Sequence, residues 1–149
     1  MSAPAAVVTD EKALAAIVRE ARSVAVIGMV DERKADRPAY TIPEMCRETG
    51  LHVIPVNPRI ENSQGLRAYP DLASVPEPFD LVDVFRRSEE VEPHADEVLA
   101  LPPGRRPAVF WMQSGIRNDA AAAKLTAAGI TVVMDRCLGV YAARYRPRA

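Results

Sequence analysis

The sequence predicts an α/β protein with a doubly wound, mainly parallel sheet of five or six strands and helices on both faces. Strand and helix patterns alternate along the chain, at spacings too long for hairpins. Continuous β-branched runs such as VAVI and TVV are typical of parallel strands that are buried on both faces. The 149 residues contain no linker-like stretch, so we expect one domain over residues 1–149, with residues 1–8 flexible.

Five segments have the apolar, β-branched composition of buried strands, and polar or turn-forming residues follow each of them. They cover residues 23–27, 52–58, 80–85, 108–113 and 131–135. A further short strand followed by one helical turn is plausible within residues 66–76, which allows a sixth strand.

Helical patterns lie before, between and after these strands. They cover residues 10–22, 42–49, 88–101 and 118–129, with a final turn or short helix after residue 135. Thr41 and Glu44 have the spacing of a capping box, which places Pro43 in the first turn of the second helix. Ser88 and Asn118 are expected to cap the next two helices.

Composition and charge exclude several classes of protein. The formal net charge of -1 argues against a general nucleic-acid binder, which normally carries a basic excess. No apolar run is long enough for a membrane span, and the first residues lack the pattern of a signal peptide. We therefore expect a cytoplasmic protein with no membrane or nucleic-acid partner and with reduced thiols at Cys46 and Cys137. His52 and His94 have no close-spaced cysteine or histidine, so no metal site is expected.

The ends of the predicted strands are the place to look for a site, because ligands of doubly wound sheets bind at the carboxyl ends of the strands. The loop after the first strand leads to a helix N-terminus, which favours an anion. Arg33, Lys34 and Arg37 can add direct phosphate contacts. Three acids in the same loop cancel its formal charge, so the alternative is a solvated surface loop of mixed charge.

The sequence features that distinguish nucleotide-binding proteins argue against NAD as the ligand. After Gly28 the dinucleotide pattern G-x-G-x-x-G does not continue, since the next glycine is Gly50. The turn after the second strand has Asn57 and Arg59 where an NAD-binding protein usually has a carboxylate. This turn would tolerate a phosphate on the ribose, which both NADP and coenzyme A (CoA) carry.

Five short motifs together resemble one family. R-P-x-Y, V-N-P, D-x-F-R, W-x-Q-x-G and M-D-R-C occur in this order in the chain. In this combination they are similar to the CoA-binding domain proteins, small Rossmann-like relatives of the CoA-binding domain in succinyl-CoA synthetase alpha subunits and in ADP-forming acyl-CoA synthetases. The resemblance covers about residues 10–141.

The resemblance implies a CoA site built from the strand ends. Its cofactor-binding residues would be Gly28, Met29, Val30, Arg33, Lys34, Arg37, Pro38, Tyr40, Asn57, Pro58, Arg59, Phe85, Arg86, Gln113 and Gly115. By position, the first three would approach the pyrophosphate, the basic residues of the first loop would contact phosphates, and Tyr40 would pack beside the cofactor. The turn at residues 57–59 would border the adenosine, residues 85–86 would line the pocket, and Gln113 with Gly115 would face the pantetheine arm. Val30 and Ala39 stand where family members often have small hydroxyl residues, so two side-chain phosphate donors are missing.

No catalytic set can be assembled from the sequence, because no serine or cysteine has an identifiable histidine base. We therefore favour a non-catalytic module that binds CoA or acyl-CoA as a carrier or sensor. One alternative is an NADP-dependent oxidoreductase. Another is a thiol-redox module acting through Cys137, whose thiol could be activated by the neighbouring Arg136, although a small buried residue is the simpler interpretation.

Overall fold

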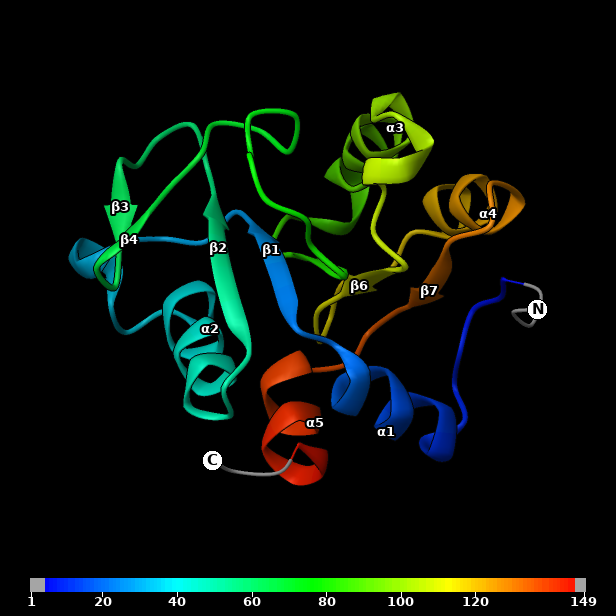
Figure 1. Ribbon diagram of the computed structural model, residues 1–149, viewed down its shortest axis with the longest axis horizontal. Coiled ribbons are helices and arrows are strands. Elements are labelled where there is room, and N and C mark those ends of the chain that lie inside the picture. Colours follow the sequence, from blue (N-terminus) through cyan, green and yellow to red (C-terminus); the bar gives the residue numbers. More distant parts are fainter. Residues whose placement is uncertain (1–4, 147–149) are drawn as a thin grey trace.

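Five strands form one parallel sheet in the order β2-β1-β5-β6-β7, in a computed structural model that describes residues 5–146 (Figure 1). The strands are β1 (Ser23–Ile27), β2 (His52–Val56), β5 (Leu81–Val84), β6 (Val109–Met112) and β7 (Thr131–Val133). The chain leaves β1 in one direction for β2 and in the other for β5, β6 and β7. The predicted doubly wound α/β fold is therefore confirmed.

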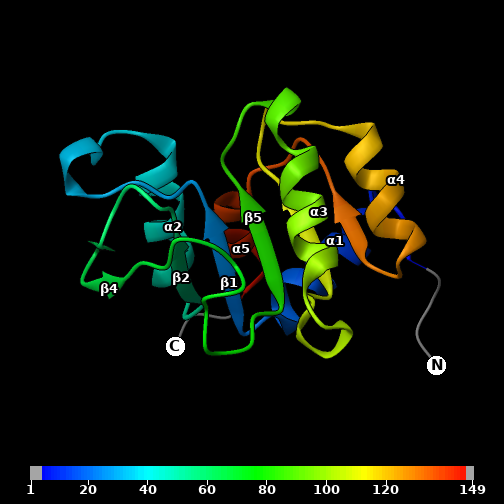
Figure 2. The ribbon, with the colours of Figure 1, turned by 90° about the horizontal axis from the view of Figure 1, so that it is seen from above.

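Two layers of helices cover the sheet, one on each face (Figures 1 and 2). One layer contains α1 (Glu11–Glu20), α2 (Pro38–Glu48) and α5 (Leu138–Tyr145), and the other contains α3 (Glu92–Ala100) and α4 (Asp119–Ala127). Side chains alternate along β5 between the two resulting cores: Val82 and Val84 face α3 and α4, whereas Leu81 faces the other layer. This alternation explains why the interiors of the strands are apolar apart from Asp83 of β5.

Both edges of the sheet are protected against further strand pairing. At the β2 edge, the Tyr69 N–H donates to the Pro55 carbonyl at 3.0 Å, so Pro55 lies where its missing N–H is not needed. At the β7 edge, Val132 exchanges hydrogen bonds with Ala6 and Val8 at 3.0 and 2.8 Å. Of residues 1–8, which we expected to be flexible, 1–4 lie outside the described residues and 6–8 pair with this edge.

The start of α2 differs from the prediction. The helix begins at Pro38, with Arg37 as its N-cap, so Thr41 lies inside the helix and the predicted capping box is wrong. Pro43 is consequently an interior residue and cannot donate to the carbonyl of Ala39. That carbonyl instead accepts the N–H of Val30 at 3.2 Å. The proline thus frees an acceptor that attaches the loop after β1 to α2.

The predicted cap of α3 is also wrong, whereas the cap of α4 is confirmed. Ser88 begins a separate 3-10 turn (Ser88–Glu90), and α3 starts after Val91 without a side-chain cap. The hydroxyl oxygen of Ser88 accepts the Arg117 N–H at 3.0 Å, which joins the end of β5 to the start of α4. Asn118 caps α4 by accepting the Ala121 N–H at 2.9 Å.

A small hairpin lies outside the main sheet, beyond β2 (Figure 1). It consists of β3 (Asn62–Ser63) and β4 (Leu66–Arg67), joined by a two-residue turn at Gln64 and Gly65 with φ angles of 54° and 74°. Both values belong to the left-handed region required by tight hairpin turns. The short strand expected within residues 66–76 is β4, but its pairing with β3 was not predicted.

One carboxyl group of the described residues is buried in the core. Asp83 of β5 is 1% exposed and lies in register with Val26 and Trp111 on the face covered by α1, α2 and α5. Within the described residues, its Oδ1 atom has no hydrogen-bond partner. Burial raises the pKa of this carboxyl well above its usual range, because the charged form is poorly solvated there.

Candidate ligand site at the strand ends

The carboxyl ends of β1 and β5 approach each other closely at a glycine. Gly28 has a φ angle of 85°, and a Cβ atom at this position would lie 2.4 Å from the carbonyl oxygen of Phe85. The Gly28 N–H donates to the Val56 carbonyl at 2.8 Å, and the Phe85 N–H donates to the Ile27 carbonyl at 2.8 Å. A side chain at position 28 would therefore push apart three neighbouring strand ends.

Asn57 connects the end of β2 to the end of β1. Its Nδ2 atom donates to the Met29 carbonyl at 2.9 Å, and its Oδ1 atom accepts the Arg59 N–H at 3.0 Å. The side chain is buried, so these bonds replace water as its partners. Asn57 thereby fixes the turn that presents Pro58 and Arg59, rather than offering its own amide to a ligand.

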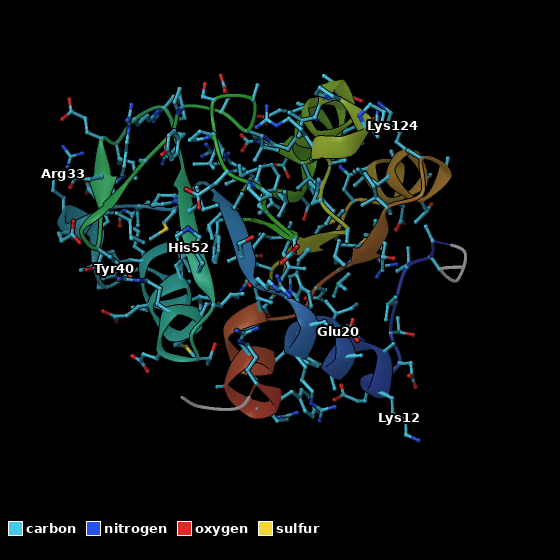
Figure 3. All side chains as sticks on the ribbon, in the orientation of Figure 1. Lys12, Glu20, Arg33, Tyr40, His52 and Lys124 are labelled. Carbon is cyan, nitrogen blue, oxygen red and sulfur yellow. The ribbon has the colours of Figure 1, made fainter. Side chains whose placement is uncertain are left out.

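The loop after β1 holds its basic residues in different ways. The Arg33 guanidinium donates to the Asp31 carboxylate at 2.9 to 3.2 Å, and this bond lowers the pKa of Asp31. Lys34 and Arg37 are exposed. Figure 3 shows that Arg33 and Tyr40 both lie on the side of the molecule that carries the hairpin.

The hairpin is attached to this loop through Glu32. The carboxylate of Glu32 accepts the Gln64 N–H at 2.7 Å and the Tyr40 hydroxyl at 3.0 Å, and the first of these bonds lowers the pKa of Glu32. The Gln64 side chain donates to the Tyr40 carbonyl at 2.9 Å, and the Ser63 hydroxyl donates to the Val30 carbonyl at 2.7 Å. Tyr40, expected beside the cofactor, is part of this attachment.

Two pockets of opposite character adjoin at the turn after β2. The first, which we call the polar cleft, has a volume of about 360 Å³ and is lined by Asp31, Arg33, Arg59, Ile60, Glu61 and Asn62. The second, which we call the apolar groove, has a volume of about 400 Å³ and is lined by Pro58, Pro70, Asp71, Ala73, Arg86, His94, Glu97, Ala100 and Leu101. Pro58 and Arg59 are consecutive, so the two pockets share this turn as a common wall.

The structure brings together only some of the predicted site residues. Arg33 and Arg59 line the polar cleft, and Pro58 and Arg86 line the apolar groove. Lys34 and Arg37 line neither pocket, and the N–H groups of Gly28 and Val30 are already paired within the protein.

The end of β6 makes its polar contacts inside the protein. Gln113 is buried, and its Oε1 atom accepts the Leu138 N–H at the start of α5 at 2.8 Å. The Gly115 N–H donates to the Asp135 carboxylate at 2.6 Å. The polar residues at this strand end therefore position α5 and the end of β7.

Sequence reasoning missed a histidine in the apolar groove. His94 and Glu97 face each other on α3, with Nδ1 of His94 3.0 Å from Oε1 of Glu97. The other carboxylate oxygen of Glu97 accepts the Leu72 N–H at 2.8 Å. We considered His94 as a metal ligand and as a base for a nucleophile, and rejected both roles. Its spacing of three residues from Glu97 was the available signal for a pair on one helix face.

Metal and membrane signals are weak in the described part of the chain. Residues 5–146 contain no group of three or more histidine, cysteine, aspartate or glutamate side chains that could hold a metal ion. None of the helices among these residues is long and apolar enough to cross a membrane.

Comparison with known proteins identifies the family. The model of a family described as CoA binding domain matches residues 22–143, which include all five strands of the sheet. The chain belongs to the CoA binding domain family. The family resemblance inferred from the five motifs is thus confirmed, and the polar cleft and the apolar groove are features of a CoA binding domain protein.

Relatives of this CoA binding domain protein include chains of similar length. It is 36% identical over 124 residues to the uncharacterized protein YneT of Bacillus subtilis, an alignment that covers 83% of this chain and 87% of YneT. The solved structure of cell-free ID.343 from Thermus thermophilus has a TM-score of 0.81 and 37% identity, and the match covers 92% of this chain and 99% of that one.

A more distant likeness concerns the fold alone. A dinucleotide-forming acetyl-coenzyme A synthetase of Ca. Korarchaeum cryptofilum has a TM-score of 0.58 and 18% identity. The match covers 74% of this chain and 25% of the synthetase.

Proposed function

We propose that this CoA binding domain protein binds coenzyme A or acyl-CoA, as a non-catalytic carrier or sensor, in the polar cleft and the apolar groove. The observation that carries the proposal is the meeting of these two pockets at Pro58 and Arg59. The nucleotide end of CoA joins a flat base to three phosphates. A base on one side of this turn and phosphates on the other would use both pockets at once.

The polar cleft suits the phosphates. Arg33 and Arg59 both line it, and a guanidinium can hold a phosphate through two parallel hydrogen bonds. Asp31 holds the Arg33 guanidinium at the cleft. A phosphate would replace Asp31 as the partner of Arg33, so Asp31 lowers the net gain from this contact while it keeps the side chain ordered.

The apolar groove suits the adenine base. Pro58, Pro70 and Leu101 supply apolar surface for a flat ring. Asp71 and Glu97 line the same groove and would repel a phosphate there. The polar cleft has two arginines and two acids, whereas the apolar groove has one arginine and two acids, so its lining is the more negative of the two. This difference favours one orientation of the nucleotide, with the base towards α3 and the phosphates towards the hairpin.

Two further observations support a binding module in a reducing compartment. Neither pocket of the described chain is lined by a serine or cysteine that could act as a nucleophile. Cys46 and Cys137 are free thiols, which supports the proposal that the protein acts in the cytoplasm.

Isothermal titration calorimetry with CoA, 3′-dephospho-CoA and NADPH tests the proposal. We expect saturable CoA binding and at least about tenfold weaker binding of CoA to Arg59→Ala, the loss expected for one charge-assisted hydrogen bond. Arg22→Ala is the matched control, because Arg22 is exposed and lies just before β1, at the amino ends of the strands and away from both pockets. Absence of binding at millimolar CoA would refute the proposal, and a clear preference for NADPH would favour the oxidoreductase instead.

A further inference from the structure

We infer that His94, held by Glu97, selects adenine over 6-oxo purines in the apolar groove. This inference rests on the proposed function, because it assigns the residue that reads the base of the bound nucleotide. Both side chains line the groove, and both are about three-quarters buried, with exposed fractions of 23% and 25%.

The hydrogen bonds of Glu97 determine which ring nitrogen of His94 carries the proton. An ionised carboxylate can only accept hydrogen bonds. Oε2 of Glu97 accepts the Leu72 N–H at 2.8 Å, and Oε1 lies 3.0 Å from Nδ1 of His94. Nδ1 of the neutral ring must therefore carry the hydrogen. Nε2, which has no hydrogen-bond partner among residues 5–146, is then an acceptor.

Besides the carboxylates of Asp71 and Glu97, the groove thus offers a donor and a neutral acceptor to the edge of a base. Arg86 is the donor, since a guanidinium has no acceptor atom, and Nε2 of His94 is the acceptor. One edge of adenine presents the complementary pair, an acceptor at N7 and a donor at the 6-amino group. A 6-oxo purine presents acceptors at both positions, so its oxygen would oppose the lone pair of Nε2.

The charged groups around the groove are consistent with a neutral base as the ligand. The acidic side chains are Glu97 on α3 and Asp71 on the segment between β4 and β5, and the basic side chain is Arg86 after β5. Hydrogen-bond matching, rather than net charge, is then what separates one purine from another.

The test compares CoA with its desamino analogue, in which a carbonyl oxygen replaces the 6-amino group, by calorimetry. Wild-type protein is expected to bind CoA at least about tenfold more tightly than the analogue, the effect of one matched hydrogen bond. His94→Phe keeps a ring of similar size but removes the acceptor, so the ratio of the two affinities should fall to about one. His52→Phe is the matched control, because His52 pairs with Glu77 in a different pocket. It should keep the wild-type ratio.

A second variant retains the imidazole of His94 and changes only which ring nitrogen carries the hydrogen. In Glu97→Gln, the amide oxygen can accept the Leu72 N–H while the NH₂ group donates to Nδ1 of His94. The ring hydrogen then moves to Nε2, and the affinity ratio should fall below one, in favour of the desamino analogue. An effect confined to stability would leave the ratio unchanged.

The outcomes separate this inference from the proposed function. Equal binding of CoA and the analogue by wild-type protein, or an unchanged ratio in both variants, would overturn the role of His94 while leaving CoA binding intact. Absence of binding for both ligands would refute the proposed function and the inference together.

Discussion

The side-chain amide of Asn57 donates to the carbonyl of Met29 at 2.9 Å and so joins the ends of β2 and β1 beneath the turn shared by the two pockets. The same side chain accepts the N–H of Arg59. A buried residue therefore positions two residues of the candidate site, Pro58 and Arg59, without lining either pocket.

Replacement of Asn57 should reduce the stability of the protein. Asn57→Asp removes the donor and places a carboxylate against the Met29 carbonyl, which should cost roughly 1–3 kcal/mol of unfolding free energy, as for other buried groups left unpaired. Urea unfolding measures this loss. Asn62→Asp, at an exposed position five residues later, should change the unfolding free energy by less than about 0.5 kcal/mol. Equal effects of the two substitutions would contradict a special role for Asn57.

Gly28 and Gly50 allow two backbone effects to be separated. Both have φ angles near 85°, at 85° and 86°, but only at Gly28 would a Cβ atom meet another atom, the carbonyl oxygen of Phe85 at 2.4 Å. Gly50→Ala should cost about 1–2 kcal/mol, the strain of a left-handed alanine. Gly28→Ala should cost clearly more, because β1 and β5 must also move apart. Thermal unfolding of both variants measures the difference, and similar losses would show that the close approach is not maintained in solution.

Asp83 should make the protein less stable as the pH rises. Its pKa is raised in the folded state by burial, whereas in the unfolded chain it lies near 4. Above pH 4 the unfolded state therefore binds fewer protons than the folded state, and stability falls with increasing pH up to the raised folded pKa. Asp83→Asn should remove this dependence above pH 4, whereas the exposed control Asp36→Asn should retain it. Chemical unfolding at several pH values tests this, and the prediction fails if Asp83→Asn unfolds with the wild-type pH profile.

Of the two arginines near the end of the described chain, Arg144 and Arg146, Arg146 should contribute more to the free energy of unfolding. Its guanidinium donates to the carbonyls of Val18 and Ala21 at 2.7 and 2.5 Å and to that of Thr49 at 3.4 Å, and so connects the C-terminal ends of α1 and α2. Arg146→Ala should lower the unfolding free energy by roughly 1.5–3 kcal/mol, the range for hydrogen bonds to charged groups.

Arg144→Ala is the control for that change. Arg144 is exposed and lies 5.9 Å from the centre of the Tyr145 ring, so its loss should cost at most about 1 kcal/mol. Urea unfolding of both variants compares them. A larger loss for Arg144→Ala than for Arg146→Ala would be inconsistent with the observed contacts.

The sheet could be predicted because its signals are local. The central strands are buried on both faces, so β1 and β6 appear in the sequence as mainly apolar runs, and β5 does so apart from Asp83. Gly28 marks the end of β1. The start of α2 was misplaced because two signals competed. The Thr41 capping box and Pro38 at the first helical position both mark helix starts, and only the tertiary contact between Val30 and Ala39 decides between them.

The rest of the site depends on long-range contacts that composition does not encode. The β3–β4 hairpin was missed because Gln64 is an unusual residue for a left-handed turn position, and because Ser63 and Glu32 stabilise it from outside the hairpin. Arg33 was predicted as a phosphate ligand and Arg59 as part of the turn that borders the adenosine, but nothing in the sequence distinguished Arg33 from Lys34 as the residue at the cleft. His94 was overlooked because the groove is formed by α3 and the distant segment at Pro70.

The most direct test of CoA binding is a titration of ¹⁵N-labelled protein with CoA, followed by NMR through the backbone amides. We predict saturable shifts at Arg33 and at Arg59 to Asn62 around the polar cleft, and at Arg86 and His94 around the apolar groove. The amides of Lys12 and Arg19 on α1, on the other side of the molecule from the apolar groove, should remain unchanged. Shifts that cluster on α1 and α5, or no saturable shift at millimolar CoA, would contradict the account.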